Sequence, residues 1–142
     1  MKYPQTKADL LAKNIRAIAD NGCLAMCYLY CIGLGGSEYN LIGILSEAMD
    51  MGLLEKDCFV SDADKFLNAY CGANRVKVIK KDITSLEEIT GDFTPVRFDY
   101  KGKGHWVVVE NGRIVFNPLL NSQCVNKGKP TTSRIITFEK RD

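Results

Sequence analysis

The sequence predicts an α+β fold in which an N-terminal helical part packs on a C-terminal antiparallel sheet. In the first two thirds, apolar residues recur at the three- and four-residue spacing of amphipathic helices. In the last third, Val, Ile and Phe gather in short runs that fit a pleated sheet. No repeat or linker interrupts the 142 residues, a length that suits one domain with one core. Helices followed by strands in this way are typical of α+β proteins, so we expect residues 1–142 to form a single domain.

Four helices are expected, and glycines end several of them. They cover residues 6–21, 23–32, 37–51 and 62–70. Thr6 and Ser37 would cap the first and third helices, which Gly22 and Gly52 would end, while Gly33, Gly35 and Gly36 follow the second. Two helices show a clear inward face, formed by Leu10, Leu11, Ile15 and Ile18 in the first and by Leu41, Ile44, Leu45 and Ala48 in the third.

Five strands are expected after the helices, with a short helical turn at residues 85–89 between the first two. They cover residues 76–79, 96–100, 105–109, 113–116 and 134–138.

The charge pattern argues against nucleic-acid or membrane partners. The net charge is +2, and the basic residues are scattered. The densest basic run, Lys77, Lys80 and Lys81, is best explained as a solvated strand end. The longest apolar run, 23–34, is too short to cross a bilayer, and the N-terminus lacks the apolar core of a secretory signal. We therefore expect a cytoplasmic protein with reduced thiols, while the oligomeric state stays open.

Three of the six cysteines, Cys23, Cys27 and Cys31, are spaced four apart and would share one helix face. A zinc site needs a second pair of ligands, and the chain offers one histidine and no second close cysteine pair, so we expect no metal or other cofactor. Cys27 and Cys31 fit the helix interior as small core residues, because free cysteine behaves as a small hydrophobe.

Cys23 differs because it opens its helix, directly after Asn21-Gly22. The first amides of a helix have no intrahelical partner and carry partial positive charge, which stabilises a thiolate. The same amides can accept the charge that develops on a carbonyl oxygen under attack. Cys23 is therefore a candidate nucleophile that still needs a base.

His105 is the single histidine and the single imidazole base available. It could be an exposed residue at a strand start, and Asn117-Pro118 could be a simple strand exit. Two pairing registers are possible for the hairpin between them. A two-residue Asn-Gly turn pairs 110 with 113 and 106 with 117. A three-residue loop pairs 109 with 113 and sets His105 opposite Asn117, with Trp106, Val108, Ile114 and Phe116 together on the other face. We expect the three-residue loop, in which the Asn117 amide orients the imidazole.

The motifs "NGCLAM", "GHWVVV" and "VFNP", in this order, resemble those of the papain-like cysteine peptidase superfamily. They are most similar to its small bacterial and phage members, such as the leader-peptide peptidases of bacteriocin exporters, over roughly residues 14–122. The resemblance implies Cys23 as nucleophile, His105 as general base and acid, and Asn117 as the orienting group. It also implies a helical lobe carrying the cysteine, packed on an antiparallel sheet, and a peptide or peptidoglycan-like amide as substrate.

The sequence departs from this family in two ways. Ala17 stands where such enzymes often carry a glutamine that donates to the oxyanion, and Asn14, Asn21 or Gln5 could replace it. "AMCY" imitates the end of the papain signature and makes Cys27 a second candidate nucleophile. A catalytically inactive papain-like binding module and an ordinary interaction protein therefore stand beside the hydrolase as alternative hypotheses.

Overall fold

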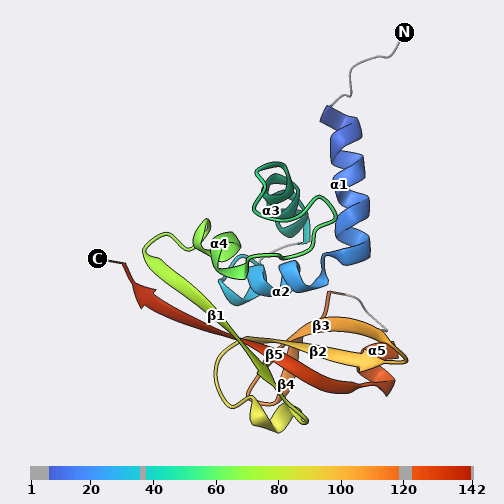
Figure 1. The fold of residues 1–142 in the computed structure, drawn as a ribbon, viewed down its shortest axis with the longest axis vertical. Coiled ribbons are helices and arrows are strands. Elements are labelled where there is room, and N and C mark those ends of the chain that lie inside the picture. The colour runs from blue at the N-terminus through green and yellow to red at the C-terminus, as the bar shows by residue number, and fades with distance from the viewer. Residues whose placement is uncertain (1–6, 36–37, 119–122, 142) are drawn as a thin grey trace.

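The computed structural model describes residues 7–35, 38–118 and 123–141, and it places a helical part against one five-stranded sheet (Figure 1). The helices are α1 (Lys7–Asn21), α2 (Cys23–Cys31), α3 (Glu38–Asp50), α4 (Ala63–Asn68), the short 3-10 helix η1 (Leu86–Glu88) and α5 (Gln123–Lys127). The strands are β1 (Asn74–Asp82), β2 (Thr94–Tyr100), β3 (Lys103–Glu110), β4 (Arg113–Phe116) and β5 (Lys129–Lys140). The predicted α+β class and its order of elements are confirmed. The proposed caps Thr6 and Ser37 lie outside the described residues.

The sheet is antiparallel, with the strand order β1-β5-β2-β3-β4. The long β5 lies between β1 and β2, so the last strand of the chain joins the first strand to the others. All five predicted strands exist, and β1 and β5 extend well beyond their predicted ends. These extensions add charged residues such as Lys80, Lys81 and Lys140, which the β-propensity pattern does not favour.

Helix α2 lies between the other helices and the sheet, and it contacts β2 and β3 (Figure 1). It is apolar all around, as expected of a helix covered on every side. Its Ala25, Tyr28 and Leu29 join the core shared with α3 and α4, whereas Cys27 packs with Trp106 and Val108 of β3.

The other face of the sheet has its own apolar cluster, which includes Val96, Phe98, Val107 and Val109. Cys124 of α5 and the segment around η1 cover it. The sequence did not predict α5, because five residues are too few to show a helical period.

The predicted inward face of α1 is partly wrong. Ile18 is buried, but Leu11 and Ile15 are 45% and 42% exposed. A polar residue adds to the contact that Ile18 makes with α3: the amide of Asn14 donates to Ser46 Oγ at 3.0 Å and to Asp50 Oδ1 at 3.0 Å. By contrast, the inward face of α3 is confirmed, with Leu41, Leu45 and Ala48 buried and Ile44 half-buried.

The expected three-residue hairpin loop is also wrong. Glu110 pairs with Arg113 around a two-residue Asn111-Gly112 turn, and both turn residues have positive φ, 49° and 76°. This is the twist that a tight hairpin favours. The register then shifts by one residue, so that Phe116 pairs with Val108. The expected core position of Ile114 is wrong as well, because it pairs with Val109 and is 38% exposed.

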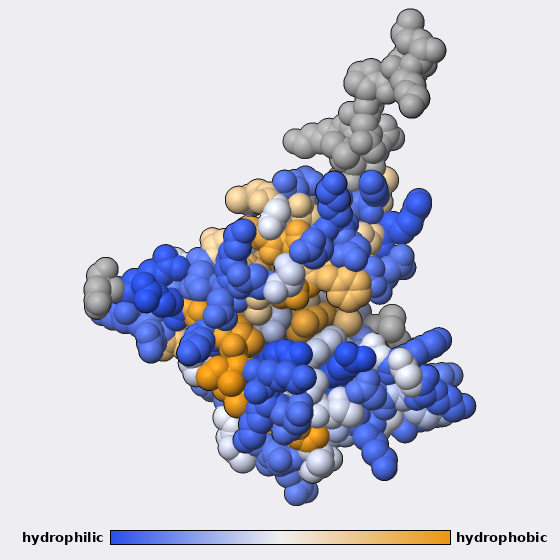
Figure 2. Space-filling model, viewed as in Figure 1, coloured by the Kyte–Doolittle hydropathy of each residue, from blue (hydrophilic) through white to orange (hydrophobic). Residues whose placement is uncertain are grey.

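The outer surface of the helical part is mixed in polarity. Figure 2 shows apolar surface across the middle of one face, where the helical part meets the sheet, with hydrophilic surface around it. Within the described ranges, none of the helices is both long and apolar enough to cross a membrane.

Candidate active site at the start of helix α2

A tight junction between α1 and α2 places Cys23 at the first position of its helix. Gly22 donates its backbone N–H to the Ile18 carbonyl at 2.8 Å, and a Cβ on Gly22 would lie 2.5 Å from that oxygen. Its φ of −87° is open to any residue, so glycine is needed here for close packing rather than for backbone freedom. No side chain caps α2, which leaves its first amides to other partners.

The Cys23 thiol uses these amides. Burial raises its pKa, and the backbone N–H groups of Trp106, Leu24 and Cys23 itself oppose this, as does the charge of Arg97. The stabilising effect that the sequence predicted for a helix start is therefore present, but burial outweighs it. The thiol therefore stays protonated up to a higher pH than an ordinary cysteine, although the donors around it favour a thiolate.

Cys27 and Cys31 have different surroundings. Burial raises the pKa of both thiols well above the ordinary thiol value. Cys27 has no exposed surface and packs against Trp106 and Val108. Its core position, predicted from the helix pattern, is confirmed, and this weakens its case as a second nucleophile. Among the described side chains, no group of three or more His, Cys, Asp or Glu could hold a metal ion.

His105 and Asn117 are brought together. Nε2 of His105 lies 2.7 Å from Oδ1 of Asn117, and the histidine is 4% exposed. An amide oxygen can only accept, so this contact favours the tautomer that carries its proton on Nε2 and its lone pair on Nδ1. The predicted contact holds although the predicted register does not. The register shift after the turn adds one residue to β4, and that residue returns Asn117 to the face of His105.

The cysteine and the histidine approach β3 from different directions. His105 pairs with Phe98, which belongs to the face of Val107, whereas Cys23 packs on the Trp106 face. Since side chains alternate along a strand, the imidazole and the thiol start on opposite faces. The last β3–β4 pair before this level is Val108–Phe116. The Cys23 thiol contacts the backbone amide of Trp106, one residue from His105.

Arg97 is a site residue that the sequence did not reveal. It pairs with Trp106 across β2 and β3, its Nε donates to Asp99 Oδ1 at 2.9 Å, and its charge lowers the pKa of Cys23. A Cβ on Gly104 would lie 2.2 Å from Arg97 Nε. Gly104 therefore lets the guanidinium cross β3 beside the candidate site. The glycine just before His105 was the available signal, but a glycine alone does not tell which side chain will lie over it.

The structure narrows the choice of oxyanion donor. Both contacts of the Asn14 amide nitrogen at 3.0 Å are made to α3, so this side chain is used to join two helices. Gln5 lies outside the described residues. Asn21 is the last residue of α1, two positions before Cys23. The backbone amides of Cys23 and Leu24 already face the thiol, which makes them the donors best placed for an oxyanion.

Comparison with known protein families gives a match over nearly the whole chain. The family described as "Protein of unknown function, DUF261" matches residues 1–138. The chain belongs to the DUF261 family. No curated protein and no solved structure matches it. Membership of DUF261 assigns no chemistry, so the function of this chain has to be inferred from its own residues.

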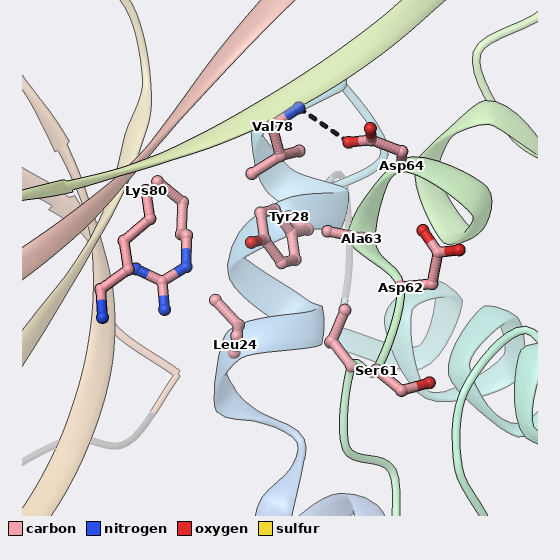
Figure 3. A pocket seen from close by; sticks show the side chains of 10 residues that line it. Leu24, Tyr28, Ser61, Asp62, Ala63, Asp64, Val78 and Lys80 are labelled. Carbon is pink, nitrogen blue, oxygen red and sulfur yellow. Dashed lines mark hydrogen bonds between the residues drawn. The ribbon is translucent and has the colours of Figure 1, made fainter.

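Beside α2, this DUF261 protein has an open pocket of about 420 Å³ between that helix, the start of α4 with the residues before it, and the β1–β5 pair. Figure 3 shows Leu24 and Tyr28 of α2 between Lys80 on one side and Asp62 to Asp64 on the other. The complete lining comprises Leu24, Tyr28, Val60, Ser61, Asp62, Ala63, Asp64, Val78, Lys80 and Arg134. Tyr28 is both buried and part of the pocket wall.

Proposed function

We propose that the protein is a cysteine-dependent hydrolase of a peptide or peptidoglycan-like amide, with Cys23, His105 and Asn117 in papain-like roles. One observation carries the proposal: the His105 imidazole bonds the Asn117 amide at 2.7 Å, one residue from the amide that the Cys23 thiol contacts. A nucleophile at a helix start, with a base and an orienting amide on neighbouring strands, supplies the three groups that acyl transfer by a thiol uses.

In the proposed reaction, Nδ1 of His105 takes the thiol proton as the Cys23 sulfur bonds to the carbonyl carbon. The carbon–nitrogen bond then breaks, and the imidazolium gives its proton to the leaving amine. Water attacks the resulting thioester with His105 as base, the carbon–sulfur bond breaks, and a carboxylic acid leaves as the thiol regains a proton. Because burial raises the pKa of Cys23, His105 acts as a general base during attack rather than as a partner in a resting ion pair.

A second candidate is a papain-like binding module without turnover. Two observations favour it: burial raises the pKa of the Cys23 thiol, and Ala17 stands in the place of the oxyanion-donating glutamine. In such a module the fold is kept, but the thiol is not activated by the imidazole.

Alkylation with chloroacetamide distinguishes the hydrolase from the binding module. The reaction of each cysteine is followed in peptide mass spectra. For the hydrolase we expect Cys23 to react before the other five cysteines near neutral pH. His105→Gln should slow Cys23 by about tenfold or more, since a general base contributes at least that much. Asn117→Ala, a milder change, should also slow it.

Unfolding curves of each variant show whether the fold is intact. Reaction of Cys23 at the same rate with and without the imidazole, in folded variants, would exclude the hydrolase and leave the binding module.

A further inference from the structure

Two positive side chains face each other at the pocket beside α2. Lys80 of β1 and Arg134 of β5 are direct cross-strand partners, and both line the pocket. Like charges placed opposite each other in an antiparallel pair are destabilising. Among the described residues, neither of the two lies within 4.0 Å of a carboxylate oxygen. In the described part of the chain, the sheet therefore holds two cations that form no ion pair, at the edge of an open cavity.

The arginine is fixed in place rather than free in solvent. Its Nη1 donates to Thr132 Oγ1 at 3.1 Å and to the Ser133 carbonyl at 3.2 Å. The guanidinium carbon lies 4.8 Å from the centre of the Trp106 ring. Arg134 also faces the Tyr28 hydroxyl and lowers its pKa, which burial raises. A guanidinium held on several sides is preorganised to bind an anion, because little side-chain freedom is lost on binding.

The acidic side chains across the pocket are used by the fold. Asp62 Oδ1 accepts from the Lys65 amide at 3.0 Å and caps α4, and Asp64 Oδ1 accepts from the Val78 amide at 2.8 Å (Figure 3). Each of these bonds holds a carboxylate on its own wall. Neither carboxylate forms an ion pair with Lys80 or Arg134, so both cations can bind an anion that enters from outside.

The pocket is connected to the candidate nucleophile on two sides. Leu24, in its wall, directly follows Cys23. Trp106 carries Arg134 over its ring and offers its backbone amide to the Cys23 thiol. A peptide with its amide carbonyl at Cys23 would pass Leu24 to reach Lys80 and Arg134 in the pocket.

We propose that Lys80 and Arg134 bind a carboxylate of the peptide substrate, either an acidic side chain near the cleaved bond or a free C-terminus. The inference rests on the proposed hydrolase and adds its substrate class, a peptide with a carboxylate close to the scissile amide. The sequence suggested only a solvated strand end for Lys80, because Arg134 opposite it is 54 residues further along the chain.

The test uses peptide chloromethyl ketones, which alkylate Cys23 after binding. The three probes are acetylated tripeptides in which one residue is Glu, at the first, second or third position, and the other two are Ala. Each probe has a counterpart with Gln in place of Glu. We expect one Glu probe to label Cys23 about tenfold faster than its Gln counterpart, as fits a charge-assisted contact. Lys80→Gln and Arg134→Gln should remove that preference, whereas Lys77→Gln, on the same strand outside the pocket lining, should keep it.

A second arm distinguishes the source of the carboxylate. Acetyl-tetraalanine with a free C-terminus and its C-terminal amide compete with the all-alanine probe. Protection by the acid alone, lost in Lys80→Gln, assigns the pocket to a chain terminus instead of a side chain. Equal behaviour of acid and amide, together with equal rates for Glu and Gln probes, overturns the carboxylate pocket.

A third measurement separates this inference from the proposed hydrolase. In the Cys23→Ala variant, acetyl-Ala-Ala-Glu is titrated while backbone amide signals of Leu24, Asp64 and Val78 are followed by NMR. Selective, His105-dependent labelling without any carboxylate dependence keeps the hydrolase and overturns the pocket. Carboxylate-dependent shifts without a reactive Cys23 keep a carboxylate site but overturn its role in hydrolysis.

Discussion

Opposing influences act on the Cys23 thiol. Burial raises its pKa, while three backbone amides and the Arg97 charge lower it. Cys31, two turns along the same helix, lacks this opposition, and burial is the cause that raises its pKa. Contact with the Trp106 amide of β3, together with the position at the helix start, therefore separates this thiol from its neighbours.

This balance predicts the pH dependence of Cys23 alkylation by iodoacetamide. The thiolate reacts, and a raised pKa means that its fraction grows above the ordinary thiol range of about 8.5. We expect the rate to climb through that range without levelling off at neutral pH. Arg97→Gln removes a charge that favours the thiolate, so the midpoint should move to higher pH. A rate that is already level at pH 7 would contradict a protonated resting thiol.

The buried Cys27 makes a second prediction. Cys27→Ser puts a hydroxyl among Trp106 and Val108 in a site without exposed surface, which should lower the free energy of unfolding by about 1–3 kcal/mol. Cys31→Ser, at a half-buried position of the same helix, is the matched control and should cost less. Urea unfolding measures both, and equal losses would argue against the packing described here.

Among the elements, the β3–β4 hairpin positions Asn117. Its two-residue turn and the shift that follows together decide which face the amide reaches. With only one of these two features, Asn117 would lie on the other face of the sheet from His105, because a one-residue slip moves every later side chain to the opposite face. The geometry of the hairpin is therefore as important to the candidate site as His105 and Asn117 themselves.

Substitution of two glycines, one in the hairpin turn and one in α3, should change the stability of the protein in opposite directions. Gly112 has a φ of 76° in the turn, so Gly112→Ala should destabilise by about 1 kcal/mol. Gly43 lies within α3 with open space around its Cα, so Gly43→Ala should stabilise by about 0.5–1 kcal/mol. Thermal unfolding of both variants checks the signs, and a stabilising Gly112→Ala would contradict the left-handed turn.

At the scale of the whole molecule, Asn68 joins Asp64 in linking the helical part to the sheet. Asn68, the last residue of α4, donates to the Val76 carbonyl at 2.9 Å and accepts from the Val76 amide at 2.7 Å. Arg141, after β5, donates to the Asn68 carbonyl at 3.1 Å. Asn68 therefore links the end of α4 to the backbone of β1 and, through Arg141, to the residue that follows β5.

Asn68→Ala should therefore destabilise the protein by about 1–3 kcal/mol, since it leaves the buried Val76 amide without its acceptor. Asn74→Ala, on exposed β1 nearby, serves as the control and should change stability by less than about 0.5 kcal/mol. Chemical denaturation is the measurement, and similar values for the two variants would contradict the role given to Asn68.

The parts of this fold that local pattern encodes could be predicted, and the long-range parts could not. The start of α2, the strand cores and the closeness of His105 and Asn117 follow from residues near one another in the chain. The pairing of Lys80 with Arg134 and the approach of Arg97 to Cys23 leave no local trace. The hairpin shift was missed because propensities do not show where a strand gains an extra residue. The exposure of Leu11 and Ile15 depends on what packs against α1, which its own sequence does not state.

The position of β5 between β1 and β2 has a consequence for how the protein forms in a cell. During translation, β1 and the helices before it emerge long before residues 129–140, which are needed to connect them to β2. The β2–β4 meander can pair as soon as it emerges, whereas β1 waits with an unpaired edge. We therefore expect the sheet to be completed after synthesis of this region rather than during it, with late closure as the slow step because its contacts are far apart along the chain.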